Sequence, residues 1–195
     1  MMPLLCRHML VPLALALASW VALAPTAYAA DTVDVKGARF ETQLESEGQA
    51  YQMIGHGLFR YMIWNAYAGA YYQPSDQPEA APLSDVPRRL ELEYFHAIEA
   101  DDFAGVTRDS VRERLGDAAY RELLPTLNAF TRAYQSVEPG DRYALTWNGD
   151  ALTLALNGQR VYEGDDPQLA RALFAIWLGD QPLKESFRND LLGRR

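Results

Sequence analysis

A nearly uncharged stretch from Tyr51 to Tyr72, YQMIGHGLFRYMIWNAYAGAYY, constrains the fold more than any other part of the chain. From Leu58 onward it is rich in aromatic and β-branched residues, which favour strands over helices. In a strand, alternate residues point to opposite faces. One face would carry Leu58, Arg60, Met62, Trp64, Ala66, Ala68 and Ala70. The other would carry Phe59, Tyr61, Ile63, Asn65, Tyr67, Gly69 and Tyr71. The first is apolar except for an arginine, and the second is aromatic with polar groups. This pattern predicts a long central strand covered on both sides, one side wetter than the other. Simple core packing with tyrosine hydroxyls at the water boundary is the alternative.

Further strands are predicted on both sides of this stretch. Residues 32–43 alternate weakly and predict an opening strand or hairpin, and residues 88–96 predict a strand with one packed face and one partly solvated face. Near the C-terminus, alternating runs are separated by Asn148-Gly149 and Asn157-Gly158, which are strong hairpin indicators. We therefore expect three antiparallel strands between 143 and 162.

Helices are predicted in two regions. Asp101 or Asp102 is expected to cap a helix that ends at Gly116, and a second helix follows to Tyr134, with Pro125 expected to kink or split it. The pair Asp166-Pro167 predicts a capped helix start, and a last short helix is expected over 182–192. Strands, then helices, then hairpins, then helices indicate an α+β fold, an antiparallel sheet with a helical layer on one face.

The N-terminal segment has the features of a secretory signal peptide. A short basic start is followed by an apolar run and by the small-x-small site Ala27-Tyr28-Ala29. We expect residues 1–29 to be removed, residues 30–195 to form a single domain, and the protein to be periplasmic rather than membrane-anchored. The one cysteine, Cys6, lies in the removed part, so the domain must be held together by its core without disulfides.

Composition excludes several classes of function. The formal net charge of −8 argues against nucleic acid or an anionic membrane surface as a partner. The common motifs of nucleophilic, metal-dependent and phosphate-binding enzymes are missing, and His56 and His96 lie forty residues apart in sequence. No metal ligand set or cofactor is predicted, no catalytic residue can be named, and the oligomeric state stays open.

Several segments together resemble the bacterial chalcone isomerase-like proteins. These are GHGLFRYMIWNAYAGAYY, LELEYFHAIEADDF, GDRYALTW with LALNG, and IWLGDQPLKESFRNDLLG, which occur in the order of that family and span nearly all of the chain after residue 29. The resemblance implies an open-faced β-sandwich with a cleft between the sheet and the helices. It also implies either cofactor-independent closure of a chalcone to a flavanone or binding of fatty acids without catalysis.

Four residues are predicted to line such a cleft: Arg60, Tyr61, Tyr67 and Tyr71. An arginine in an apolar strand needs an anion or carbonyl groups, because a buried unpaired guanidinium is costly. Its fork suits a carboxylate or phenolate, although a structural ion pair is the alternative. In the common bacterial pattern the basic residue stands one place earlier, where this chain has Phe59. Arg60 would therefore face the cleft only with a bulge near Gly57, or if the cleft lay on the Met62/Trp64 side.

These observations lead to three functional hypotheses. The first is a binder of an anionic apolar molecule, such as a fatty acid or a polyphenol-like compound, without catalysis. The second is an isomerase or intramolecular lyase of the chalcone isomerase type. The third is an interaction module whose cleft is filled by its own side chains.

Overall fold

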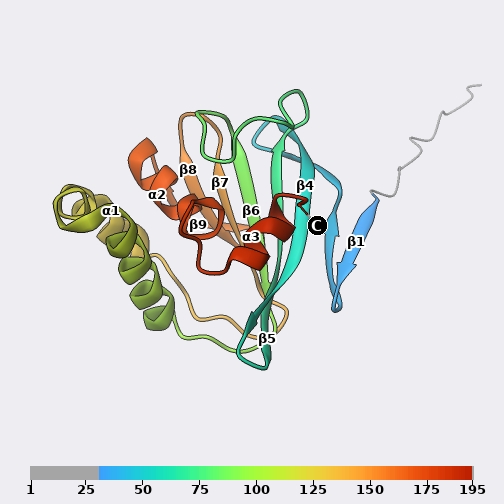
Figure 1. Ribbon diagram of the computed structural model, residues 1–195, viewed down its shortest axis with the longest axis horizontal. Helices are drawn as coiled ribbons and strands as arrows, with labels where there is room; N and C mark the ends of the chain where they lie inside the picture. The colour runs from blue at the N-terminus through green and yellow to red at the C-terminus, as the bar shows by residue number, and fades with distance from the viewer. Residues whose placement is uncertain (1–30, 195) are drawn as a thin grey trace, which may run out of the picture.

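The computed structural model describes residues 31–194 as a curled antiparallel sheet with all three helices on one side (Figure 1). Seven strands pair in the order of the sequence, each antiparallel to the next. They are β3 (Gln43–Ser46), β4 (Gln49–Tyr61), β5 (Trp64–Pro74), β6 (Arg88–Tyr94), β7 (Arg142–Trp147), β8 (Leu152–Leu156) and β9 (Gln159–Gly164). A separate hairpin of β1 (Thr32–Val35) and β2 (Ala38–Glu41) lies on the other side of the sheet. The predicted α+β fold class is confirmed.

The stretch that we expected to form one long strand is a hairpin. The chain turns at Met62-Ile63, and Tyr61 pairs with Trp64 across a two-residue turn. No glycine, asparagine or proline marks this turn, so alternation continued through it unbroken and the prediction of a single strand was wrong. The Asn-Gly pairs behave as predicted, since Asn157-Gly158 joins β8 to β9 and Asn148-Gly149 lies between β7 and β8.

The helical layer consists of α1 (Ala100–Thr131), α2 (Pro167–Leu178) and α3 (Glu185–Leu191). The backbone of α1 leaves helical geometry at Gly116, the predicted boundary, and no second break occurs at Pro125. Its N-cap is Glu99 rather than an aspartate. The predicted cap of α2 is confirmed, because the Asp166 carboxylate accepts hydrogen bonds from the backbone N–H groups of Gln168 and Leu169.

Two apolar cores lie on the two faces of the sheet. The larger one packs the helices against the concave face, and the smaller one packs Phe40 of the β1–β2 hairpin against Tyr51 and Tyr72 on the convex face. The hairpin also covers the face of β6 that we expected to be partly solvated. Glu91 on that face is only 6% exposed, and it is compensated by ion pairs to Arg89 at 2.9 Å and Arg142 at 3.1 Å.

The Gly-x-Gly of β4 lets the last helix approach the sheet. A Cβ atom at Gly55 would lie 2.3 Å from the carbonyl oxygen of Asp190, and one at Gly57 would lie 2.5 Å from the Asp190 Cβ. On the neighbouring strand, a Cβ at Gly69 would lie 2.7 Å from the ring of Phe187. The three glycines therefore form the surface on which α3 packs, and a larger residue at any of them would displace the helix.

The predicted signal peptide, residues 1–29, lies outside the described residues. Among the residues that are described, no helix is long and apolar enough to cross a membrane.

Candidate functional site

An apolar pocket of about 520 Å³ lies between the β4–β5 hairpin and the helices. Its wall combines residues of the two strands with residues of α1, α2 and the connecting segments. They are Phe59, Tyr61, Ala66, Tyr67, Tyr94, Ile98, Asp102, Phe103, Val106, Thr107, Tyr134, Ile176, Trp177 and Leu183. Aromatic and aliphatic groups make up most of this lining, as is usual for sites that bind small apolar molecules.

A β-bulge shapes the strand side of the pocket. Phe59 pairs with Tyr67 and Arg60 pairs with Asn65, which leaves Ala66 as the extra residue. Ala66 and Tyr67 thus both line the pocket. Phe59 and Tyr67 stack with their ring centroids 4.6 Å apart, and the edge of Phe187 supports both rings from α3. The aromatic wall is therefore held in place by the helix that the glycines admit.

The polar groups inside the pocket are hydroxyls that are held neutral. The indole N–H of Trp177 donates to the Tyr67 hydroxyl at 3.0 Å, and the hydroxyls of Thr107 and Tyr134 share a hydrogen bond of 2.9 Å. Burial raises the pKa of Tyr67 and of Tyr134 well above the ordinary value for tyrosine. Burial also raises the pKa of Tyr94, whose hydroxyl has no hydrogen bond within the described residues. These groups can orient a ligand, but they are poor proton acceptors near neutral pH.

Among the described residues that line the pocket, Asp102 is the only charged one, and it is exposed in the first turn of α1. Outside the lining, the Lys184 ammonium lies 5.8 Å from the ring centroid of Phe59 and donates to the backbone carbonyl of Arg60 at 2.7 Å. Neither Lys184 nor Arg60 forms a salt bridge within the described residues. The lining thus contains one exposed acid, and a cation lies beside the aromatic wall at Phe59.

The structure brings two of the four predicted site residues to the pocket. Tyr61 and Tyr67 line it, whereas Arg60 and Tyr71 do not. Arg60 is exposed, and its Nε donates to the Asn65 side chain at 3.3 Å. Successive strand residues alternate, so Arg60 is directed away from the face of Phe59 and Tyr61. Register shifts occur at Ile54 in β4 and at Ala66 in β5, and Arg60 stays outside the lining.

Tyr71 instead holds the proline-rich segment between β5 and β6. It is fully buried, and its hydroxyl donates to the carbonyl of Pro82 at 3.3 Å. The guanidinium of Arg88 donates to the same carbonyl at 2.9 Å. Burial raises the pKa of Tyr71 to about 12.

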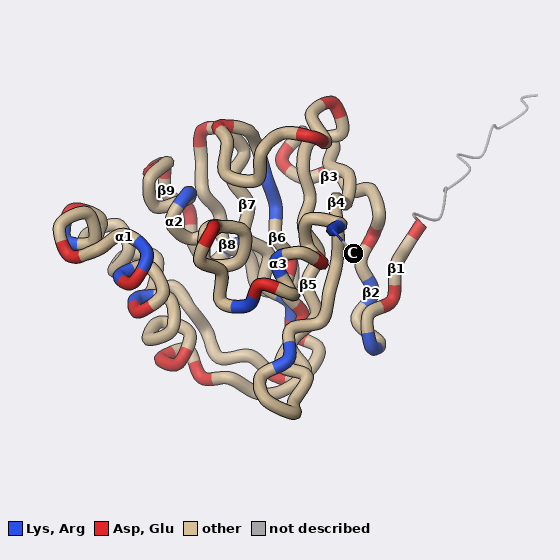
Figure 2. Tube along the Cα trace, in the orientation of Figure 1, with Lys and Arg blue, Asp and Glu red and all other residues tan. Residues whose placement is uncertain are grey.

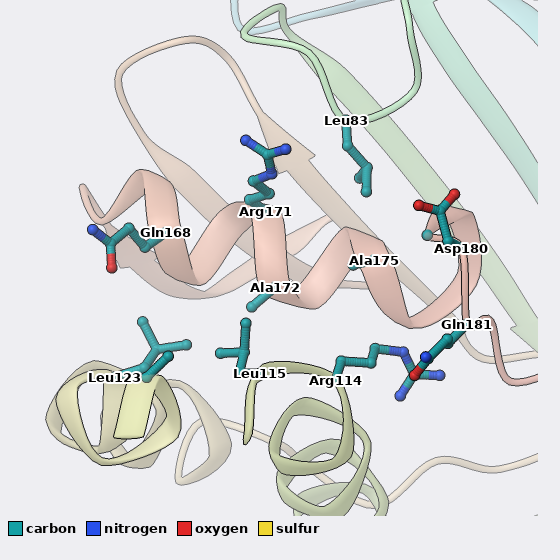
Figure 3. Close-up of a pocket in the computed structure, with 12 residues that line it drawn as sticks. Leu83, Arg114, Leu115, Leu123, Gln168, Arg171, Ala172, Ala175, Asp180 and Gln181 are labelled. Atoms are coloured by element: carbon teal, nitrogen blue, oxygen red, sulfur yellow. The ribbon is translucent and has the colours of Figure 1, made fainter. Parts of the chain in front are cut away.

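A second hollow, of about 440 Å³, lies on the outer side of α2 (Figure 3). This outer hollow is lined by the small side chains Ala172 and Ala175 of α2 and by Leu115, Leu123 and Arg114 of α1. It lacks the aromatic lining and the paired hydroxyls of the inner pocket. No cluster of three or more potential metal-ligating side chains is found in the part of the chain that the structure describes.

The family resemblance extends over nearly all of the described chain. A family model described as chalcone isomerase-like matches residues 32–193. The chain belongs to the chalcone isomerase-like family. Among solved structures, the chain is similar to a crystal structure of a fatty-acid binding protein from Arabidopsis thaliana, with a TM-score of 0.66 and 17% sequence identity. The match covers 83% of this chain and 96% of the plant protein, so it extends over the whole fold. A comparison with curated proteins gives no match.

The helical half of the pocket and the cation Lys184 beside it were not predicted from the sequence. Val106 on α1 is 54% exposed and lines the pocket. Lys184 lies far from the central strands in sequence, and only the packing of α3 places it beside Phe59. No local pattern in the sequence marks Val106 or Lys184 as a residue of the site.

Proposed function

We propose that this protein binds a fatty acid or a similar anionic amphiphile, without catalysis, in the pocket between the β4–β5 hairpin and the helices. The observation that carries the proposal is an apolar cavity whose one charged lining residue, Asp102, is exposed. Lys184 lies beside the lining residue Phe59 and forms no salt bridge within the described residues. The similar Arabidopsis structure is titled a fatty-acid binding protein, which supports the same chemistry.

The proposed orientation follows from the distribution of charge. The alkyl tail would lie among Phe59, Tyr67 and Trp177, and the carboxylate would stay at the rim near Lys184. Ten buried CH₂ groups would contribute about 8 kcal/mol at about 0.8 kcal/mol each, so the tail supplies most of the affinity. The carboxylate remains partly hydrated and avoids the cost of burying a charge among neutral tyrosines.

Two tryptophan substitutions on α1 test which hollow is used. Val106→Trp would narrow the entrance of the inner pocket, and Ala119→Trp would fill the outer hollow, which Ala119 lines. Both positions are exposed, so neither change disturbs the core. Titration with dodecanoic acid should show at least tenfold weaker binding for Val106→Trp and unchanged binding for Ala119→Trp. The reverse pattern would assign the ligand to the outer hollow and refute the proposal.

Isomerase activity is the second candidate, and family membership favours it. The pocket offers hydroxyls that could stabilise a developing phenolate or enolate. However, the raised pKa values keep these hydroxyls protonated near neutral pH, and none of the described lining residues, Arg60 included, supplies a cation. We expect no cyclisation of a 2′-hydroxychalcone above the spontaneous rate, measured by chiral chromatography. Stereoselective flavanone formation would establish catalysis instead.

We also propose that the protein works in the periplasm after removal of residues 1–29. The support is the small-x-small site that ends at Ala29. N-terminal sequencing of protein from the periplasmic fraction should begin at Ala30 or within two residues of it. A mature protein that keeps Met1 would refute this assignment.

A further inference from the structure

Exposed large apolar side chains concentrate around the entrance of the pocket. The tip of the β4–β5 hairpin consists of four of them in succession: Tyr61 is 67% exposed, Met62 82%, Ile63 85% and Trp64 60%. Val106 and Leu183, which are also exposed, line the same pocket. The tip projects below the rest of the sheet in Figure 1, and it carries no charged residue in Figure 2. Apolar patches of this kind mark contacts with proteins or membranes.

The turn at this tip does not have the sequence that a stable hairpin prefers. Three other two-residue turns in the described chain are Lys36-Gly37, Glu47-Gly48 and Asn157-Gly158, each with glycine in the second position. At the tip the second position is Ile63 instead of glycine. Met62 takes a positive φ of 52°, as Lys36 and Glu47 do at the same position, a conformation that favours glycine or asparagine. The chain therefore gives up local stability at the one turn that borders the pocket. A residue choice that opposes local structure often reflects function.

The chemistry of the tip and its base matches the interface of a lipid bilayer. Trp and Tyr are enriched at the boundary between head groups and acyl chains, and Met and Ile suit the acyl region below it. Arg60 and Lys184 lie next to the tip, and their polar partners are a carbonyl and an amide oxygen rather than a carboxylate. Both cations are thus available to lipid phosphate groups. The net charge of −8 favours a zwitterionic surface over an anionic one.

A second copy of the chain is a less suitable occupant. An exposed aromatic side chain presents about 150–250 Å², so four partly exposed large side chains offer on the order of 600 Å². A stable protein interface buries about 800 Å² per partner, with polar residues around the rim. A protruding tip of this size is small for a dimer but sufficient for shallow insertion into a bilayer.

We propose that the β4–β5 tip inserts reversibly into a zwitterionic bilayer surface, so that the pocket exchanges its ligand directly with the membrane. The exchange step rests on the proposed binding of an amphiphile, whereas the insertion step stands on the tip alone. Insertion places the entrance at the depth where fatty acids reside, and the ligand can move without crossing water. The bilayer is a transient partner, and the protein is released with its cargo.

A turn substitution separates membrane contact from folding. The double variant Met62→Asn/Ile63→Gly installs the turn sequence already used at Asn157-Gly158, so its thermal stability should equal or exceed that of the wild type. The matched control is Leu115→Ser, since Leu115 is an exposed apolar residue, 38% exposed, on the outer hollow. In flotation with phosphatidylcholine vesicles, the turn variant should partition at least tenfold more weakly, and Leu115→Ser should partition as the wild type does.

The same proteins separate this proposal from the proposed function. The turn variant should still bind dodecanoic acid in solution within threefold of the wild type, but it should take the acid up from vesicles at least tenfold more slowly. Failure of all proteins to bind the acid would refute the binding function and leave vesicle partition as the test of insertion. Equal flotation of wild type and turn variant, or no flotation of the wild type, would overturn the insertion. A wild-type dimer that the turn substitution dissociates would assign the tip to a second copy instead.

Discussion

Replacement of Lys184 by methionine should remove the preference of the pocket for a carboxylate over an alcohol. Methionine keeps an unbranched apolar stem, and Lys184 gives no side-chain hydrogen bond as the N-cap of α3, so the helix should still form. Lys184 is half-buried as a residue, and the hydrogen bond from its ammonium to the Arg60 carbonyl is exposed. Exposed ion pairs contribute about 0–1 kcal/mol, whereas truncating a desolvated pair costs about 2–5 kcal/mol. We expect a loss of about 1.4 kcal/mol, or tenfold in affinity for dodecanoic acid.

The matched control is Arg60→Met, which removes the other cation near the entrance. Arg60 faces away from the pocket lining, so this variant should bind dodecanoic acid within threefold of the wild type. The measurement is calorimetric titration with dodecanoic acid and with dodecanol, which lacks the charge. Lys184→Met should weaken binding of the acid and leave binding of the alcohol unchanged. A larger loss of acid binding in Arg60→Met would refute the orientation derived from the structure and restore Arg60 as the receiver of the head group.

Three further predictions concern the framework of the site. Gly57→Ala should lower the free energy of unfolding by about 1–3 kcal/mol because its Cβ would meet Asp190. Gly105→Ala, at a position of α1 where a Cβ would meet nothing, should raise it by about 0.5–1 kcal/mol. Equal melting temperatures of the two variants would contradict the close packing of α3 on the glycines. Tyr67→Phe should lower the free energy of unfolding by about 1–3 kcal/mol by leaving the Trp177 N–H without its acceptor. Tyr72→Phe should be neutral or stabilising because the Tyr72 hydroxyl is buried without a hydrogen bond. Urea titration that finds Tyr72→Phe the less stable variant would contradict the role of the Tyr67–Trp177 hydrogen bond. Burial raises the pKa of Tyr67 and Tyr72, so the folded state keeps protons that the unfolded state releases above about pH 10. The free energy of unfolding should therefore be constant from pH 7 to 9 and fall above pH 10. A rise above pH 10 would show that the wrong groups had been identified.

The sequence predicted elements best where local chemistry decides the backbone. Asn157-Gly158, the Asp166 cap and the break at Gly116 each depend on a residue type with a specific conformational preference. The hairpin at Met62-Ile63 was missed for the opposite reason, because its residues oppose the turn that they form. Tertiary placement determines that turn, and alternation alone could not show it.

The candidate site was only partly predictable because its two halves come from distant segments. The strand wall of Tyr61 and Tyr67 followed from alternation, and both residues lie in the pocket. Alternation along β4 directs Arg60 away from Phe59 and Tyr61. The bulge at Ala66, which brings Ala66 and Tyr67 together into the lining, has no marker in the sequence. Lys184 reaches Phe59 through the packing of α3 against glycines more than 110 positions earlier. Long-range packing of this kind cannot be read from a local pattern.

The central claim is that an alkyl chain occupies the space between the β4–β5 hairpin and the helices. Nuclear Overhauser effects from dodecanoic acid labelled with ¹³C at its terminal methyl group test it most directly. We expect contacts from this methyl group to the rings of Tyr134 and Trp177, which line the inner pocket. Contacts to Leu115 and Leu123 in the outer hollow, or no saturable contacts at all, would contradict it.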